Sequence, residues 1–223
     1  MKAYGFAENR WGGDCPKVGD VQDVRGFLSD GGDRVREGTP FSLLRTGQTT
    51  SYGAGSDGAI EAGAAQSFTD NGNGTVTDNR TGLVWAKKSD DGSIHDKDNT
   101  YTWGQTVSPY SMNGTMVTTY LATLNAGSGF AGYTDWRIPN LEELESIRNL
   151  ETFSPATFSA FNTGCTAGCT VTSCSCTVSG YYWSSSTSRS SPAYAWDVGF
   201  SLGYGLLDLK TTNLYVRAVR GGS

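Results

Sequence analysis

The chain has little positive charge, a single histidine and no long hydrophobic run. Its 223 residues carry 17 Lys and Arg against 22 Asp and Glu, which gives a formal net charge of −5. Nucleic-acid binders usually show a basic stripe, so we expect no nucleic-acid partner. No stretch of about 18 apolar residues is present, which argues against insertion into a membrane. A single histidine cannot form a metal-binding triad of histidines, and it is not part of a Ser/His/Asp order typical of serine hydrolases. We therefore expect no enzyme activity and no cofactor.

The amino-terminal residues MKAYGFAENRWGGD also lack the apolar core of a signal peptide. Three alternatives stay open: a mature form of an exported protein, export by another route, or a protein that stays inside the cell. Abundant instead are glycine, with 30 residues, and aromatic residues, at 12%. Such a chain buries a core but spends much of its length in turns and loops.

Four of the five cysteines lie close together, at Cys165, Cys169, Cys174 and Cys176. Disulfides would fasten this Gly-, Ser- and Thr-rich loop and would indicate an oxidising compartment. Zinc is a second alternative, although the spacing lacks the paired C-x2-C of structural sites, and free thiols are a third. We predict disulfides of undetermined pairing and no metal. Cys15 stands alone and is predicted to be a free thiol.

The first 43 residues are predicted to form an N-terminal extension that packs on the domain or on a partner. A ligand-binding domain is expected over residues 44–223, and its first part, 44–65, is expected to be an extended linker. Two β-prone runs between Phe68 and Asp78 flank Asn-Gly repeats, a strong hairpin signal. A third strand is predicted over residues 83–87.

Two polar loops resemble metal-binding loops in their residue types. The loop from Asp70 to Asp78 looks like a calcium loop, but its twelfth position is Thr81 instead of Glu, so we predict a hairpin turn. The loop 89–99 holds the only histidine, His95, beside two aspartates. No second nitrogen or sulfur ligand is near it in the sequence, which favours solvated surface over a metal site.

Two helices are predicted in the middle of the chain. Over residues 115–125, apolar residues recur at spacings of three and four and so share one helix face. The second helix is predicted to begin after Asn140, an N-cap residue with Glu143 as its capping-box partner. Its expected buried face comprises Leu141, Leu144, Ile147 and Leu150.

The C-terminal stretch, residues 180–223, is predicted to hold a binding surface within a rigid frame. Strands are expected over 183–185, 195–200 and 215–220, with turn residues and leucines of no clear period between them. An irregular segment held by a frame is a common form of binding surface. Arg217 is expected to tie the closing strand to the fold. The frame comprises Trp183, Trp196, Val198, Phe200, Tyr215, Val216 and Val219.

Several sequence motifs occur in an order that one protein family shares. They are FTDNGNGTVTDNRTGLVWAK at 68–87, IHDKDNTYTW at 94–103, NAGSGFAGYTDWRIPNLEEL at 125–144, YYWSSS at 181–186 and YVRAVRGG at 215–222. Together they resemble the Lcl C-terminal domain family, which is named after a bacterial collagen-like adhesin. The resemblance runs from about Leu44 to Gly222. It implies an α+β, C-type-lectin-like fold with two helices, short mostly antiparallel sheets and long loops.

The C-type-lectin-like fold implies three functional branches. Calcium-dependent sugar binding uses Glu-Pro-Asn or Gln-Pro-Asp and Trp-Asn-Asp motifs, which Ile138-Pro139-Asn140 and Trp196-Asp197-Val198 do not match. The formylglycine-generating-enzyme branch needs catalytic cysteines, and the cysteines at 165–176 do not match the cysteine pattern of that branch. The third branch consists of variable proteins whose C-terminal stretch is diversified by retroelements.

The third branch implies a restriction on residue types. Its diversified positions typically derive from AAC codons, whose adenine mutations cannot yield Lys, Glu, Gln, Met or Trp. From Ser186 to Leu214 the only such residues are Trp196 and Lys210, where the family framework expects fixed residues. Undiversified members also have C-termini rich in Ser, Tyr and Asn, so an undiversified cell-surface adhesin that binds glycans or matrix stays open as the alternative.

We therefore predict a non-enzymatic protein that recognises a protein or glycan on another surface. Leucines and tyrosines grouped on one surface would form an apolar patch, and such patches mark interaction sites. The location is expected to be extracellular, on a cell surface or a virion, and homo-oligomerisation stays open. A formylglycine-generating type of enzyme has the least support. The predicted ligand-binding residues are Ser186, Ser188, Arg189, Ser191, Ala193, Tyr194, Asp197, Gly199, Ser201, Leu202, Tyr204, Leu206, Leu207, Asp208, Leu209, Thr212, Asn213 and Leu214.

Overall fold

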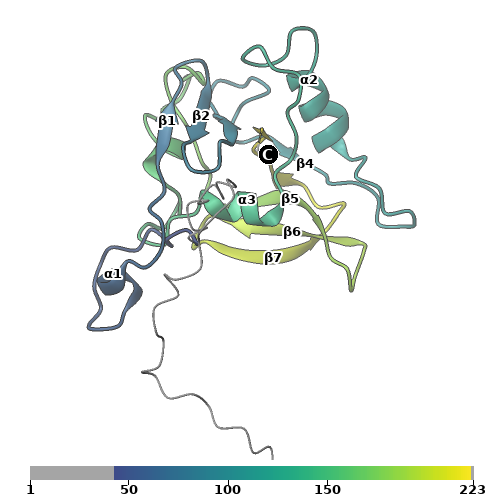
Figure 1. The fold of residues 1–223 in the computed structure, drawn as a ribbon. Helices are drawn as coiled ribbons and strands as arrows, with labels where there is room; N and C mark the ends of the chain where they lie inside the picture. The colour runs from purple at the N-terminus through teal and green to yellow at the C-terminus, as the bar shows by residue number, and fades with distance from the viewer. Residues whose placement is uncertain (1–42, 222–223) are drawn as a thin grey trace, which may run out of the picture. The chain divides into compact units, whose positions relative to one another are not determined.

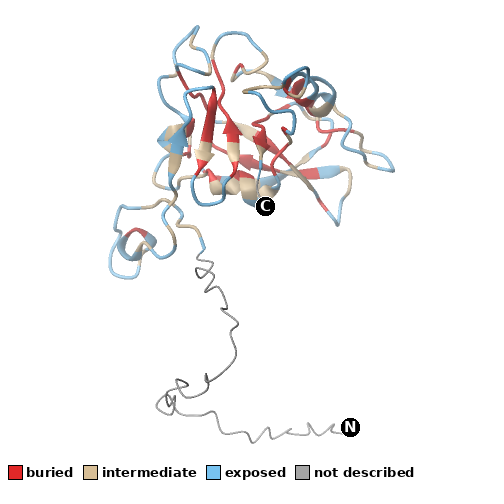
Figure 2. Ribbon diagram, turned by 45° about the horizontal axis from the view of Figure 1, so that its top comes forward, coloured by how far each residue is buried: buried red, intermediate tan, exposed pale blue. Residues whose placement is uncertain are grey.

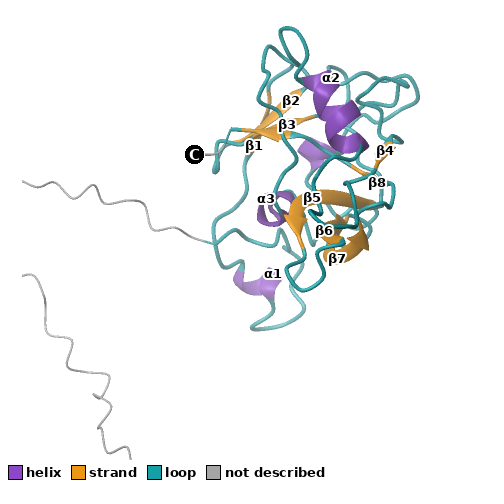
Figure 3. Ribbon diagram, turned by 90° about the vertical axis from the view of Figure 1, so that its right-hand side faces the viewer, coloured by secondary structure: helices purple, strands orange, loops and turns teal. Residues whose placement is uncertain are grey.

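The structure, a computed structural model, describes residues 43–221 (Figure 1). Two β-sheets and a few short helices are joined by long loops, which Figure 3 shows in teal. This is the α+β arrangement that the sequence predicts. The N-terminal extension predicted over residues 1–43 lies, apart from its last residue, outside the described residues. The same holds for Cys15.

The described residues form one sheet of four strands and one of five. The first has the order β1 (Phe68–Asp70), β2 (Thr75–Asp78), β3 (Val84–Ala86), β9 (Val219–Arg220), with antiparallel pairs throughout. The second has the order β4 (Thr100–Tyr101), β8 (Leu214–Tyr215), β5 (Tyr181–Thr187), β6 (Tyr194–Gly199), β7 (Tyr204–Leu209). Its β5–β8 pair is parallel and its other pairs are antiparallel. Strand β7 is therefore an edge.

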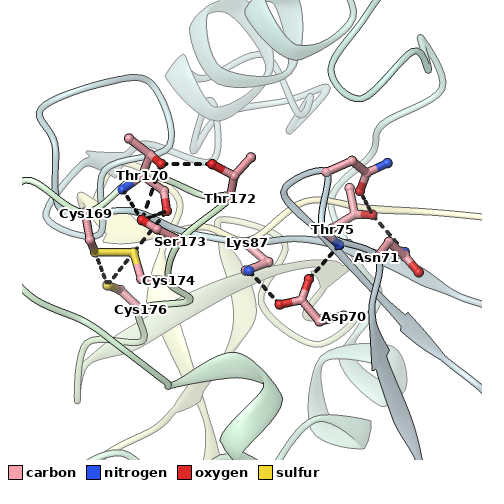
Figure 4. Close-up of polar contacts among 12 residues, drawn as sticks. Asp70, Asn71, Thr75, Lys87, Cys169, Thr170, Thr172, Ser173, Cys174 and Cys176 are labelled. Atoms are coloured by element: carbon pink, nitrogen blue, oxygen red, sulfur yellow. Dashed lines mark hydrogen bonds and ion pairs between the residues drawn. A yellow bond between two sulfur atoms is a disulfide. The ribbon is translucent and has the colours of Figure 1, made fainter.

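The predicted hairpin and third strand are confirmed, since β1 pairs with β2 and β2 with β3. The connecting turn relies on Gly72 and Gly74, whose φ angles of 72° and 90° lie in the left-handed region that favours glycine. One carboxylate oxygen of Asp70 accepts a hydrogen bond from the Gly72 amide, and the other pairs with Lys87 Nζ at 2.8 Å (Figure 4). The hairpin itself therefore uses the aspartate that gave the loop its calcium-loop appearance.

The helices are short. The helix predicted over 115–125 is present as a π-helical turn, η1 (Met116–Leu121), which continues into α2 (Ala122–Leu124). The second predicted helix is α3 (Leu141–Ser146). Two further turns, α1 (Asp57–Ile60) and the 3-10 helix η2 (Ser159–Phe161), were not predicted. No helix within residues 43–221 has the length and apolar character that crossing a bilayer requires.

The start of α3 is set by the capping box that the sequence predicts. The Asn140 side chain accepts a hydrogen bond from the Glu143 amide, and the Glu143 carboxylate accepts one from the Asn140 amide. Leu144 and Ile147 are buried as expected, although Ile147 lies one residue past the helix end. Leu150 is 38% exposed, so its predicted place on the buried face is wrong. The helix ends before a fourth apolar position can form.

Residues 44–65 are folded rather than extended, which corrects the linker prediction. A parallel bridge joins Leu44 to Ala64, and the turn α1 lies between them. The Glu151 carboxylate accepts hydrogen bonds from the backbone of this segment, including the Thr49 amide at 2.7 Å. Contacts distant in sequence therefore hold a segment whose own Gly- and Ala-rich composition suggested a linker.

The core is divided into two clusters, and Figure 2 shows the buried residues concentrated in the strands. One cluster joins η1 and α2 to the inner strands, and it includes Trp103, Met116, Tyr120, Leu124, Trp183 and Val216. The other joins α3 to both sheets, and it includes Val76, Trp85, Leu144, Phe161, Tyr182, Val198 and Val219. The frame of the C-terminal stretch thus belongs to the core, except that Trp196 and Tyr215 are half-buried.

The closing strand predicted over 215–220 is wrong as a single element. The chain enters the five-stranded sheet as β8, leaves it, and joins the four-stranded sheet as β9. Arg217 lies at the crossing and is 1% exposed. Its guanidinium donates hydrogen bonds to the carbonyls of Ala86 and Cys176 and to the hydroxyl of Thr177. Arg217 therefore connects the crossing segment to β3 and to the cysteine loop.

The clustered cysteines form two disulfides, as predicted. Cys165 pairs with Cys176, and Cys169 pairs with Cys174, the latter drawn in Figure 4. These bonds close a loop whose residues are mostly polar and exposed. In this pairing the sulfur atoms of all four cysteines form disulfide bonds.

Candidate ligand-binding surface on strands β6 and β7

Strands β6 and β7 form a hairpin at the free edge of the five-stranded sheet (Figure 1). Six residue pairs face each other, from Tyr194 opposite Leu209 to Gly199 opposite Tyr204. Strand β5 supports the inner side of the hairpin, with Tyr181 opposite Gly199 and Trp183 opposite Asp197. Because neighbours across a strand pair share a face, this register assigns every side chain of the hairpin to one of two faces.

One face is the helix face, defined by Tyr194, Trp196, Val198, Gly205, Leu207 and Leu209. Helix α3 covers its Val198 end, since Val198 and Leu144 belong to the same core cluster. A Cβ atom added to Gly205 would lie 3.5 Å from the Glu145 carboxylate. At the other end, Leu207 and Leu209 remain 38% and 41% exposed.

The opposite face is the tyrosine face, defined by Tyr181, Trp183, Ala195, Asp197, Gly199, Tyr204, Leu206 and Asp208. The hydroxyls of Tyr181 and Tyr204 are 3.2 Å apart, and their rings meet edge to face with centroids separated by 6.4 Å. Gly199 makes this possible, because a Cβ there would come within 2.9 Å of the Tyr181 ring. Tyr204 and Leu206 are exposed at the rim.

Six of the predicted binding residues are exposed apolar or aromatic side chains. They are Tyr194, Leu202, Tyr204, Leu206, Leu207 and Leu209, and Leu202, in the turn between the strands, is the most exposed at 65%. The sequence suggested one patch, whereas the structure distributes them over both faces of the hairpin. The reason is that successive side chains of a strand point to opposite faces, and neither face is fully covered at these positions of β7. A ligand that grips the edge would contact both sets.

Other predicted binding residues have polar surface roles or lie beneath the surface. Arg189, Ser191 and Asn213 are exposed, and Ser186, Ala193, Ser201, Asp208 and Thr212 are half-buried. Four of them are buried, namely Ser188, Asp197, Gly199 and Leu214. Ser188 lies inside the β5–β6 turn, where its hydroxyl accepts the Ser191 amide, and Leu214 packs in the core. Without a conformational change, these four residues have no surface that a ligand could contact.

Lys210 holds the end of β7 against the rest of the domain. Its ammonium donates a hydrogen bond to the Tyr110 carbonyl at 2.9 Å and lies 3.8 Å from the centre of the Trp103 ring. The Lys210 carbonyl accepts the amides of Trp103 and Gly104. Lys210 is fully buried, so it has a framework position, and with Trp196 it is one of the two residues that adenine mutation of AAC codons cannot produce.

Asp197 is the feature of this surface that sequence reasoning left unexplained. The residue has no exposed surface, and neither carboxylate oxygen has a hydrogen-bond partner among the described residues. Burial raises the pKa of Asp197 to about 7, and the negative charge of Asp208 adds to the rise. An unpaired buried carboxylate is costly. Only the tertiary structure reveals it, because burial and hydrogen-bond partners depend on contacts that are distant in the sequence.

The histidine loop is less solvated than predicted. The His95 ring packs at a tilt against Phe130 with 4.1 Å between ring centres, and its buried Nδ1 atom has no hydrogen-bond partner among the described residues. Burial and the nearby Lys88 ammonium lower the pKa of His95 to about 4, so the ring is neutral. Three carboxylates gather in the same loop, from Asp90, Asp96 and Asp98. Lys97 forms ion pairs within this group, which partly neutralises it.

The two sheets, the helices η1–α2 and α3, and the long disulfide-fastened loops define a C-type-lectin-like α+β domain. The family model described as the Lcl C-terminal domain matches residues 74–220, so this chain belongs to that family. Comparison with curated proteins and with solved structures found no match.

Family membership confirms the resemblance that the sequence motifs indicated, from Gly74 onward. The match leaves residues 44–73 uncovered, so the domain start predicted at residue 44 stays a prediction. The family consists of lectin-like binding domains and is not a known enzyme family. A lectin-like domain with two disulfides is consistent with an extracellular location.

Proposed function

We propose that the hairpin β6–β7 is the recognition surface of an extracellular binding protein, and that it contacts a protein or glycan on another cell, virion or matrix. The observation that carries the proposal is the set of exposed apolar residues on this edge hairpin. Exposed apolar side chains on a rigid support are the usual anchors of protein interfaces. The core clusters do not include these exposed side chains, so substitution of them leaves the core intact.

We further propose that a retroelement diversifies this surface. In the stretch 186–214, Trp196 and Lys210 are the only residues whose types adenine mutation of AAC codons cannot yield. Lys210 is fully buried and bonded to the Tyr110 carbonyl, and Trp196 is half-buried. The exposed positions of the hairpin carry residue types that the mechanism can supply. This distribution is what diversification limited to the surface produces.

The genomic test is independent of any ligand. A diversified protein has a reverse-transcriptase gene nearby and an imperfect copy of its 3′ coding end that differs only at adenines. Finding both, with the mismatches at codons of the exposed residues, would support diversification. Finding neither would favour the alternative of an undiversified adhesin.

The binding test uses arrays of glycans and of cell-surface and matrix proteins, probed with the labelled full chain. Replacement of Leu206 and Leu207 together by serine removes an exposed apolar side chain from each face. We expect loss of the array signal by tenfold or more, with unchanged thermal stability. The matched control is Ile60→Ser, because Ile60 is also exposed, at 60%, but lies in α1. Equal loss in the control, or no loss in the double variant, would refute the proposed surface.

A further inference from the structure

The tyrosine face contains a carboxylate that the fold itself leaves without a partner. Asp197 is fully buried, and both of its oxygens lack a hydrogen-bond donor within residues 43–221. Buried carboxylates in proteins are ordinarily paired or hydrogen-bonded. An exception on a surface already proposed to bind a ligand indicates that the ligand supplies the donor.

Asp197 lies next to the partly exposed rim of the sheet, and its surroundings carry negative charge. Asp197 lies between the fully buried Trp183 on β5 and Leu206 on the edge strand, which is 39% exposed. The half-buried Asp208 lies on the same face, two positions further along β7. These two carboxylates and the Tyr181–Tyr204 pair occupy one continuous face.

Positive charge from the described part of the chain does not neutralise this face. The ion pairs of residues 43–221 include neither Asp197 nor Asp208. The nearest lysine along β7, Lys210, directs its ammonium to the Tyr110 carbonyl and the Trp103 ring. The net charge of −5 adds a long-range attraction for cations.

The chemistry of the face favours an organic cation over a metal ion. Calcium takes six to eight oxygen ligands, whereas this face combines two carboxylates with a leucine and aromatic rings. A guanidinium group donates two parallel N–H bonds to the two oxygens of one carboxylate, and its flat surface stacks on aromatic rings. Asp197 offers both oxygens and Tyr204 offers an exposed ring.

We propose that the tyrosine face is a subsite for an arginine side chain of a target protein, with its guanidinium paired to Asp197 and stacked beside Tyr204. This inference rests on the proposed function and names the chemistry that the hairpin recognises. Asp208 supplies a second negative charge, and Leu206 moves aside to cover the methylene part of the arginine side chain. In that position Leu206 would also exclude water from the ion pair, which strengthens the pair.

The probe for the test is N-acetyl-arginine methylamide, and N-acetyl-citrulline methylamide is the neutral comparison of nearly the same shape. Backbone amide NMR spectra of the full chain are recorded during titration with each compound. We expect saturable shifts at Asp197, Leu206 and Asp208 with the arginine compound, and at least tenfold weaker binding of the citrulline compound. Equal binding of both, or no saturable shift in the hairpin, would overturn the proposal.

Two variants separate a binding role from a structural one. Asp197→Asn keeps the shape and removes the charge, so we expect at least a tenfold weaker affinity for the arginine compound and an otherwise native spectrum. Glu142→Gln removes one exposed carboxylate from α3, and its affinity should equal that of the wild type. Carboxyl NMR adds a second readout, because bound guanidinium should lower the pKa of Asp197, which burial and Asp208 hold at about 7.

The outcome is distinguishable from failure of the proposed function. If the double variant Leu206→Ser, Leu207→Ser loses array binding while Asp197→Asn retains it, the recognition surface stands and the arginine subsite is wrong. If neither change reduces array binding, the recognition surface itself is wrong. Loss of array binding in Asp197→Asn, restricted to arginine-containing targets, is the result that the subsite requires.

Discussion

The buried Asp197 carboxylate should make the stability of the domain fall as pH rises, and replacement by asparagine should remove that fall. The pKa of Asp197 lies at about 7 in the folded protein, against an ordinary value of 3.8, because burial disfavours the charge and Asp208 repels it. The folded state therefore holds a proton that the unfolded state releases. The stability that accompanies the neutral carboxyl is complete below about pH 4 and is lost as pH rises through about 7.

The magnitude follows from the size of the pKa rise. At 1.36 kcal/mol for each pKa unit, a rise of roughly three units corresponds to about 4 kcal/mol above pH 7. Movement of Leu206 on the edge strand would let water reach the carboxylate, so we expect between ~2 and ~4 kcal/mol. Asp197→Asn should match the wild type near pH 4 and exceed its stability by this amount near pH 8.

The assay is urea unfolding followed by tryptophan fluorescence, from pH 4 to pH 8, with the disulfides intact. The six tryptophans give a strong signal, and Trp183, directly opposite Asp197, reports on the hairpin. Glu142→Gln serves as the control for loss of one exposed carboxylate. The reasoning is refuted if the stability difference between Asp197→Asn and wild type is the same at pH 4 and pH 8. The same variant is predicted to bind the arginine probe less well. A gain in stability with a loss of function is a common trade-off at functional sites.

Three further predictions concern the frame and the surface. Asn140→Ala removes the side-chain half of the capping box and should lower the free energy of unfolding by about 1 kcal/mol in urea titrations; an unchanged midpoint would mean that packing alone fixes α3. Replacement of Cys165 and Cys176 by serine opens a loop of twelve residues. By the loop-entropy relation this should lower the free energy of unfolding by about 3 kcal/mol, measured by thermal unfolding. A loss under about 0.5 kcal/mol would show that other contacts hold the loop without the disulfide. Leu207→Ser should change the unfolding free energy by less than about 0.5 kcal/mol, because surface substitutions rarely exceed that, and a larger loss in calorimetry would place Leu207 in the core.

Local signals in the sequence predicted local structure well. Asn-Gly repeats gave the β1–β2 hairpin, and Asn140 with Glu143 gave the start of α3. These signals act within a few residues, so the sequence states them directly. The same holds for the cysteine loop, where close spacing indicated disulfides even though the pairing was open.

Predictions that depended on distant contacts failed or were incomplete. The β-prone run at 215–220 divides between two sheets because β5 and β3 each pair with only part of it. Residues 44–65 fold back because Glu151, far along the chain, accepts their backbone amides. No periodicity within these segments contains that information.

Some features of the hairpin β6–β7 follow from the sequence alone, and others follow only from the tertiary structure. The sequence by itself identified the family motifs, the scarcity of certain residue types between Ser186 and Leu214, and a group of leucines without an evident core role. Only the tertiary structure decided that β7 is an edge strand with exposed leucines on both faces, and that Asp197 lies buried without a hydrogen-bond donor among residues 43–221. The physical reason is that composition fixes which side chains are available, whereas exposure and hydrogen-bond satisfaction depend on which strands pair and which edge stays free.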